Sequence, residues 1–172
     1  MPLRTSFALL LTAGAPLLQG STDLTSNRAL RLLASHNRER AAAGLPPLTW
    51  NSELEASARG YSEELRRLGY LVHARTEPRD PDPEGENLWA GTRGHYSPER
   101  MVGLWIEEKK YYRPGPCPHN SKTGKVADVG HYTQLMWRST SHVGCAVAQN
   151  DRMEFLVCRY SEGGNVVGER PF

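Results

Sequence analysis

Two cysteines on either side of a short polar turn place the strongest constraint on how this chain folds. Residues 142–148 and 154–160 both have the composition of β-strands, and a polar segment joins them. If the turn is centred on residues 151–152, Cys145 lies directly opposite Cys158, at the Cα separation of about 4.5 to 5.5 Å found in antiparallel pairs. That separation suits a disulfide. The alternative is a pair of buried free thiols.

Cys117 has no partner in that arrangement. It lies in a segment rich in Pro, Gly, Asn and Lys, residues 113–128, where we expect an exposed thiol in a mobile loop. A metal site shared with His119 is the weaker alternative, because no other ligand has matching spacing.

Residues 27–43 are predicted to form the first helix, because apolar residues recur there at helical spacing. Within it, His36 and Arg40 are four positions apart and are therefore neighbours on the helix surface. We interpret His36 as a hydrogen-bonded structural residue rather than as a ligand. The apolar face, which we expect to pack inward, carries Leu30, Leu33, Asn37 and Arg40, with Ala29 and Leu32 beside them.

The second helix, at residues 52–68, has the clearest pattern in the chain. Ser52 and Glu55 have the spacing of a capping box at its start, and Gly69 is placed to end it. Apolar residues follow one another at alternating steps of four and three, as in an amphipathic helix. They are Leu54, Ala58, Tyr61, Leu65 and Leu68.

A third helix is predicted to begin after Ser97, a suitable capping residue, with Pro98 at its first position. Its inward face carries an acidic residue, Glu108, whereas Glu107 points away. A carboxylate on an inward face is costly unless it is paired or bound to a cation, which makes Glu108 a candidate site residue. The rest of that face is formed by Met101, Leu104, Trp105 and Tyr112.

The segments between these helices complete the fold prediction. Residues 70–73 are expected to be extended, and residues 77–85 to form a surface loop, because three prolines there exclude regular structure. Residues 86–90 are predicted to form a short strand. With the hairpin, these segments predict an α+β fold that has three main helices and a small, mostly antiparallel sheet.

The polar groups of the chain are most concentrated at residues 130–139, Gly-His-Tyr-Thr-Gln-Leu-Met-Trp-Arg-Ser. A plain core segment would not hold so many groups that each need a hydrogen-bond partner when buried. One interpretation is a single helical turn followed by the apolar residues 135–137. The other is the wall of a polar cleft with His131 facing inward.

This stretch resembles the first signature of the CAP superfamily, which comprises cysteine-rich secretory proteins, antigen 5 and pathogenesis-related 1 proteins. Three further stretches agree with the family's patterns in the family's order: residues 36–40 (HNRER), 85–88 (GENL) and 155–166 (FLVCRYSEGGNV). Glu162 replaces a proline that the family usually has. The resemblance covers residues 24–172 and implies a three-layer α-β-α sandwich.

The resemblance also implies a polar cleft. The family's cleft tetrad corresponds to His73, Glu86, Glu108 and His131. The two histidines are the implied ligands of a divalent metal, with zinc preferred, because neutral imidazole binds zinc through nitrogen and glutamate supplies oxygen. Thr133 and Gln134 are expected to be cleft or structural residues beside them. The alternative is a buried network of hydrogen-bonded ions without a metal.

The function that the resemblance implies is a secreted, non-enzymatic module that binds a lipidic or small ligand, such as a sterol or fatty acid, or a partner. The alternative is a metal-dependent hydrolase in which Glu86 or Glu108 is the general base. Against it, the chain has no His-Glu-x-x-His helix and no Gly-x-Ser-x-Gly elbow. A structural domain with an inert tetrad is the third hypothesis.

The first residues have the layout of an export signal. Arg4 supplies a positive charge, and an apolar run begins at Phe7 and fades by Leu18, before small residues. We therefore predict a signal peptide at residues 1–23 and a secreted or periplasmic location, where a disulfide persists. A buried N-terminal helix is the alternative.

Length, charge and hydropathy indicate how many domains the chain forms and which partners to expect. A chain of 172 residues suits a single domain that buries most of its apolar surface. Its net charge of +2 gives no indication of a nucleic-acid partner. No apolar run is long enough to predict a transmembrane helix in the mature protein.

Overall fold

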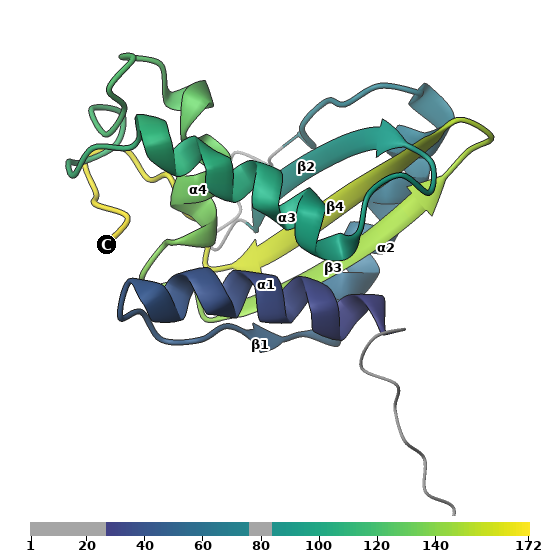
Figure 1. The fold of residues 1–172 in the computed structure, drawn as a ribbon, viewed down its shortest axis with the longest axis horizontal. Helices are drawn as coiled ribbons and strands as arrows, with labels where there is room; N and C mark the ends of the chain where they lie inside the picture. The colour runs from purple at the N-terminus through teal and green to yellow at the C-terminus, as the bar shows by residue number, and fades with distance from the viewer. Residues whose placement is uncertain (1–26, 76–83) are drawn as a thin grey trace, which may run out of the picture.

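The computed structural model describes residues 27–75 and 84–172, which form a mixed β-sheet with helices on both faces (Figure 1). The predicted signal peptide lies outside these residues. None of the described helices is both long and apolar enough to cross a membrane. In chain order the elements are α1 (Arg28–Ala42), β1 (Thr49–Trp50), α2 (Ser52–Leu68), β2 (Gly85–Thr92), α3 (Pro98–Ile106), the 3-10 helices η1 (Glu107–Tyr111) and η2 (Val126–Asp128), α4 (Gly130–Leu135), β3 (His142–Gln149) and β4 (Met153–Ser161).

The sheet has the strand order β1-β3-β4-β2, and only the β1–β3 pair is parallel. The predicted hairpin is confirmed as β3 and β4, and its register places Cys145 opposite Cys158. Their Cα atoms are 4.1 Å apart and their sulfurs are bonded. The disulfide prediction is therefore confirmed.

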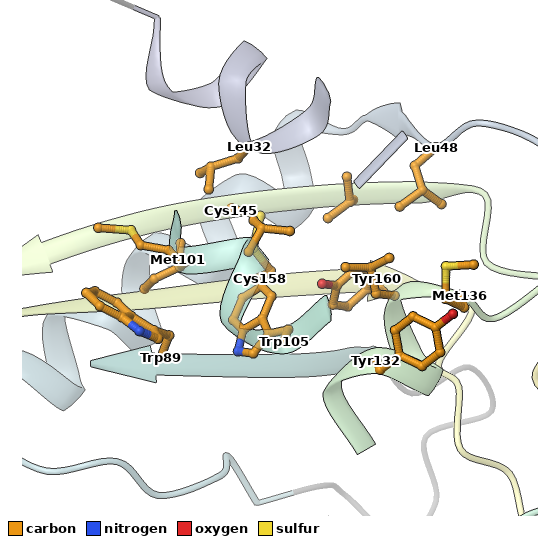
Figure 2. Close-up of a cluster of buried hydrophobic side chains, with 14 of the residues drawn as sticks. Leu32, Leu48, Trp89, Met101, Trp105, Tyr132, Met136, Cys145, Cys158 and Tyr160 are labelled. Carbon is orange, nitrogen blue, oxygen red and sulfur yellow. A yellow bond between two sulfur atoms is a disulfide. The ribbon is translucent and has the colours of Figure 1, made fainter. Parts of the chain in front are cut away.

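Side chains of β4 alternate between two hydrophobic clusters, one on each face of the sheet. Phe155 and Val157 pack with α2, whereas Leu156 and Tyr160 pack with residues of α1 and α3 in the larger cluster (Figure 2). This alternation is the period of a strand that is buried on both faces. The α+β sandwich is confirmed, with α2 covering one face and α1 and α3 covering the other (Figure 1).

The predicted inward face of α1 is partly wrong. The buried residues are Leu32, Ser35, His36 and Arg40, whereas Leu30 is 38% exposed. The helix packs against both α3 and β3. Its buried polar side chains bond elsewhere, His36 to Tyr160 of β4 and Arg40 to the Leu135 carbonyl of α4. Apolar periodicity alone therefore did not identify all of the buried residues of this helix.

Helix α2 has the predicted extent, but its cap differs. Asn51, not Ser52, is the N-cap, and its side-chain oxygen accepts the N–H groups of Glu53 and Leu54 at 2.8 and 2.9 Å. A short acceptor side chain at this position satisfies amides that have no partner within the helix. Gly69 ends the helix as predicted, in the left-handed region at φ 79°.

The segments before and within the predicted third helix also differ from expectation. Residues 70–73 form no strand, and β2 is longer than residues 86–90. Ser97 caps α3 as predicted, but the α-helix ends at Ile106 and continues as η1. Glu108 therefore lies on a tighter 3-10 turn.

The prediction that Cys117 is an exposed thiol is wrong. Cys117 is only 4% exposed, because its backbone pairs with the C-terminal segment through hydrogen bonds to Gly168 and Glu169. Its sulfur donates to the Asn165 carbonyl at 3.3 Å. Burial raises the pKa of the thiol, so it is protonated at neutral pH.

Candidate functional site

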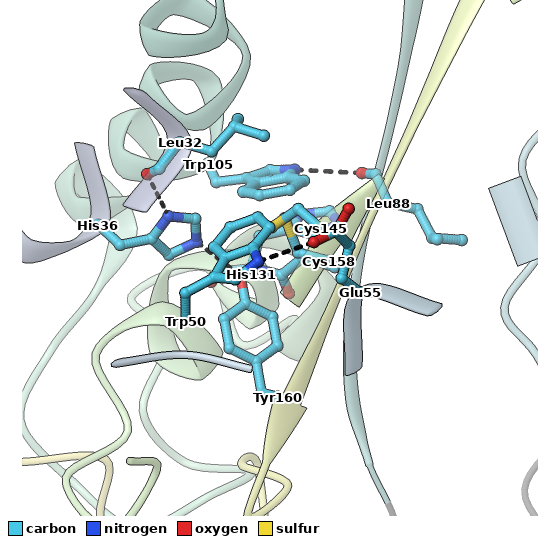
Figure 3. The surroundings of a disulfide bond; sticks show 11 residues. Leu32, His36, Trp50, Glu55, Leu88, Trp105, His131, Cys145, Cys158 and Tyr160 are labelled. Atoms are coloured by element: carbon cyan, nitrogen blue, oxygen red, sulfur yellow. Dashed lines mark hydrogen bonds between the residues drawn. A yellow bond between two sulfur atoms is a disulfide. The ribbon is translucent and has the colours of Figure 1, made fainter. Parts of the chain in front are cut away.

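One polar residue from each of the four sequence motifs takes part in a single chain of hydrogen bonds, and Figure 3 shows its start at His36. His36 Nδ1 donates to the Leu32 carbonyl at 2.8 Å, so Nε2 accepts the Tyr160 hydroxyl at 2.9 Å. Asn87 Nδ2 donates both to that hydroxyl and to the His131 carbonyl, at 3.1 and 3.0 Å. The chain of bonds joins α1, β4, β2 and α4. His36 is thus the structural residue that the sequence predicted.

Trp105 fixes the ring of His131 from the other side. The two rings stack with centroids 5.9 Å apart and planes inclined by 16°, and the indole nitrogen donates to the Leu88 carbonyl at 3.1 Å (Figure 3). Buried indole N–H groups usually need such an acceptor. The imidazole of His131 is consequently held in one orientation.

Glu108 pairs with His131 and caps the helix that carries it. One carboxylate oxygen contacts His131 Nδ1 at 2.6 Å, and the other accepts the N–H groups of His131 and Tyr132 at 3.0 and 3.1 Å. The N-cap position, Val129, offers no side-chain acceptor. The carboxylate therefore satisfies orphan amides at a helix N-terminus, where negative charge is favoured.

Replacing Glu108 with glutamine is expected to lower the free energy of unfolding by about 1 to 3 kcal/mol, because an amide lacks the charge and one of the acceptors. Glu107→Gln is the matched control. Glu107 pairs with exposed Arg100, and its loss should change stability by less than about 1 kcal/mol. Chemical denaturation of both variants measures the difference. Equal losses would contradict the role assigned to Glu108.

Glu86 pairs with the second histidine of the tetrad. Its Oε1 contacts His73 Nδ1 at 2.6 Å and accepts the Ala74 N–H at 3.1 Å. Its Oε2 lies 2.9 Å from a guanidinium nitrogen of Arg159. The hydrogen bond to Glu86 raises the pKa of His73 above its usual value, although partial burial opposes the shift.

The four residues of the tetrad form two histidine–glutamate pairs, His73 with Glu86 and His131 with Glu108. Asn87 follows Glu86 and bonds the His131 carbonyl, so the pairs lie near one end of β2. Within residues 27–75 and 84–172, no three or more His, Cys, Asp or Glu side chains converge as a ready metal cluster. In the same residues, each imidazole uses Nδ1 on its carboxylate, and no bond occupies Nε2.

Thr133 and Gln134 bind the C-terminal segment. Thr133 Oγ1 donates to Asn165 Oδ1 at 2.6 Å, and Gln134 Oε1 accepts the Gly164 N–H at 2.7 Å. The amide of Gln134 donates to Thr140 Oγ1 at 3.3 Å. Both side chains are buried, and their contacts are those of residues that fix the loop beside the tetrad.

Sequence reasoning did not single out Arg159 as part of the site. It lies opposite Glu86 in the β2–β4 register and contacts Glu84 as well, at 3.5 Å. The signal available in the sequence was an arginine that directly follows the apolar residues of a strand. Oppositely charged residues that face each other on paired strands attract. The register needed to use that signal follows only from the folded sheet.

Comparison with known proteins agrees with the motifs. The profile of the Cysteine-rich secretory protein family, CAP, matches residues 33–160. Pathogenesis-related protein 1C of Nicotiana tabacum is 37% identical over 142 residues, which are 81% of this chain and 78% of that protein. Pathogenesis-related protein PR-1 of Medicago truncatula is 37% identical over 145 residues, covering 83% and 78%.

Two solved structures share the fold. NaASP2 with Zn²⁺ has a TM-score of 0.69 and 21% identity, and the alignment covers 92% of this chain and 90% of that one. BmVAL-1 has a TM-score of 0.67 and 21% identity, covering 89% and 85%. With the motifs, the sandwich and the identities to the plant proteins, these matches place the chain in the CAP family, the cysteine-rich secretory protein family.

Proposed function

We propose that this CAP protein is a secreted, non-enzymatic binding module that takes a lipidic ligand in an apolar hollow beside α1. One observation carries the proposal: Leu30 and Leu33, on the apolar face of α1, border an open hollow instead of being fully buried. Secretion is supported by the leader-like first residues and by the disulfide, which persists in oxidising compartments.

The hollow has a volume of about 420 Å³ and lies where the outer face of α1 meets the start of α3. Its apolar wall comes from Leu30, Leu33 and Ala34. At its rim, Arg31 holds Glu99 through two contacts of 2.7 Å, which keeps the pKa of that carboxyl at about 2. An apolar wall with a charged rim suits a ligand that has a hydrocarbon body and a polar head.

Filling the hollow is expected to weaken ligand binding at least about tenfold, because a large side chain would occupy the space of the hydrocarbon. The test uses Ala34→Trp, with Ala56→Trp on the exposed face of α2 as the matched control. Titration with a fluorescent fatty acid and a fluorescent sterol measures affinity. The tetrad is polar, so the double variant His73→Ala/His131→Ala should keep the wild-type affinity for the lipid. If that double variant folds but loses the lipid, or Ala34→Trp keeps it, the hollow is not the site.

A divalent metal at the histidines is a second candidate function, and the orientation of the two rings favours it. Glutamates on Nδ1 leave the lone pair of Nε2 on His73 and His131 able to bind a metal, and carboxylates commonly orient histidine ligands of metals in this way. The related NaASP2 was solved with Zn²⁺. His73 and His131 would hold the metal, which would supply positive charge there when bound. Two protein nitrogens make a weak site, which fits reversible binding.

Zinc affinity is expected to be highest near pH 8 and to fall steeply toward about pH 5.5, because only neutral imidazole binds the metal. Glu86 raises the pKa of His73, so protons compete from a higher pH than for a free histidine. Calorimetric zinc titration should show binding lost in His73→Ala and His131→Ala but kept in His95→Ala, whose side chain is exposed. Binding that survives both single tetrad variants would remove the metal proposal.

The hydrolase alternative needs a glutamate that is available as a general base. Glu108 accepts three hydrogen bonds, and Glu86 is held between His73 and Arg159. This engagement supports the binding role. Ester and peptide hydrolysis measured with zinc and with a chelator tests the alternative, and chelator-sensitive turnover that is lost in Glu86→Gln or Glu108→Gln would favour it over the binding module.

A further inference from the structure

The outer edge of β3 is only partly paired. Strand β1 is two residues long and pairs with His142 and Val143, whereas β3 continues to Gln149. After Trp50 the chain leaves the sheet and enters α2. Among the strands that the structure describes, the second half of β3 therefore has a neighbour, β4, on one side only.

The direction of the main-chain groups along this edge follows from two observations. Val143 accepts the Asn51 N–H at 3.0 Å, so the carbonyl of Val143 points toward the β1 side. The Cα separation of 4.1 Å between Cys145 and Cys158 is that of a pair without mutual hydrogen bonds, so the amide and carbonyl of Cys145 point away from β4. By alternation, Val147 faces the same way.

These groups have no partner in the part of the chain that the structure describes. No hydrogen bond from an element other than β4 reaches the carbonyl of Cys145 or the amide and carbonyl of Val147. Unpaired strand edges are a template for pairing with another extended chain. The edge offers the carbonyl of Cys145 and the amide and carbonyl of Val147 in the spacing of a strand.

A hollow of about 290 Å³ lies along this edge, between the two helical layers. Figure 1 shows α1 in front of the sheet and α2 behind it, so the hollow is a slot with a helix on each side. Its lining comes from the start of α1, the first half of α2 and the middle of β3. These residues are Arg28, Ala29, Leu32, Glu55, Arg59, Cys145, Ala146 and Val147.

The charges of the slot select among extended partners. Two arginines and one glutamate line it, and Arg59 is already paired with Glu55. Arg28 is exposed and makes no ion pair or hydrogen bond within residues 27–75 and 84–172. The slot therefore keeps one positive charge for an incoming carboxylate.

We infer that this slot binds an extended peptide segment carrying an acidic side chain, which adds to the sheet beside Cys145 and Val147 and pairs its carboxylate with Arg28. Main-chain hydrogen bonds supply the affinity, and the arginine supplies the preference for acid. The surface is separate from the tetrad and from the lipid hollow, so the inference does not depend on either.

The experiment uses the disulfide-bonded protein and the peptide acetyl-Thr-Val-Glu-Val-Thr-amide as probe. Calorimetry gives affinity, and NMR of isotope-labelled protein follows the Val147 amide. We expect that amide to shift, and we expect affinity to fall about tenfold or more for a Lys-centred peptide and for Arg28→Glu. Arg38→Glu, an equal charge change at an exposed site on the same helix, should bind as wild type does.

Two further measurements separate strand pairing from a charge contact. Val147→Pro removes the edge-facing N–H, which an edge strand tolerates, and should abolish binding. The probe N-methylated at its three central residues should not bind the wild-type protein, which keeps the test independent of how that variant folds. The inference fails if the methylated probe binds as tightly as the unmodified probe, or if no probe binds at millimolar concentration. It also fails if the wild-type protein is a dimer that Val147→Pro converts to monomers, since a second copy of the chain would then occupy the edge.

Discussion

Replacing Arg40 with methionine should lower the free energy of unfolding by about 3 to 5 kcal/mol. The side chain is fully buried, and burial lowers its pKa to about 10, so it carries its charge at neutral pH. Methionine keeps most of the stem but leaves buried acceptors without donors. The guanidinium donates to four main-chain carbonyls, those of Pro46, Leu135, Trp137 and Thr140.

The comparison that isolates this effect is Arg38→Met. Arg38 is exposed on the same helix, and its loss should change stability by no more than about 0.5 kcal/mol. Urea denaturation followed by tryptophan fluorescence measures both variants. Arg40→Lys should fall between them, because an ammonium reaches fewer carbonyls than a planar guanidinium. Similar midpoints for Arg40→Met and Arg38→Met would mean that the buried network contributes little.

Stability should also fall by about 3 kcal/mol as pH drops from about 6.5 to 4, because of His36 alone. Full burial lowers the pKa of His36 to about 4, the hydrogen bond to Leu32 opposes the shift, and nearby Arg40 adds to it. The unfolded chain has the ordinary pKa of about 6.5. Between these values the unfolded state binds more protons, so folding stability increases with pH in this window and is lost on acidification.

A direct measurement is the free energy of unfolding of wild type and His36→Phe at several pH values. The variant lacks the titrating group, so the two curves should lie farthest apart at neutral pH and approach each other toward pH 4. His95→Gln removes an exposed histidine instead and should follow the wild-type curve. Curves that stay parallel from pH 7 to pH 4 would show that His36 does not set the acid limit.

The features that the sequence predicted correctly depend on neighbours close in the chain. The hairpin register follows from a short turn, the end of α2 from Gly69, and the start of α3 from Ser97. The separation of Glu108 from Glu107 also held, although η1 is a 3-10 helix, because a tighter turn still places adjacent residues on different sides.

The errors concern partners that are far apart in the sequence. His36 and Arg40 occupy the inner face of α1 because their hydrogen-bond partners come from β4 and from residues 135–140. Hydrophobic periodicity contains no information about such partners, so it placed Leu30 inside and left His36 out of the inward face. The tetrad positions came from the family resemblance, whereas the partner of each imidazole followed only from the folded chain.

Because Cys117 is buried, the reactivity of its thiol measures how often the C-terminal segment opens. The chain has three cysteines and two are bonded to each other, so Cys117 is its single free thiol. Its sulfur lies under residues 165–169, which must lift before a maleimide can reach it. The labelling rate of the native protein thus reports how often that segment opens locally, a motion distinct from global unfolding, without any probe being engineered into the sequence.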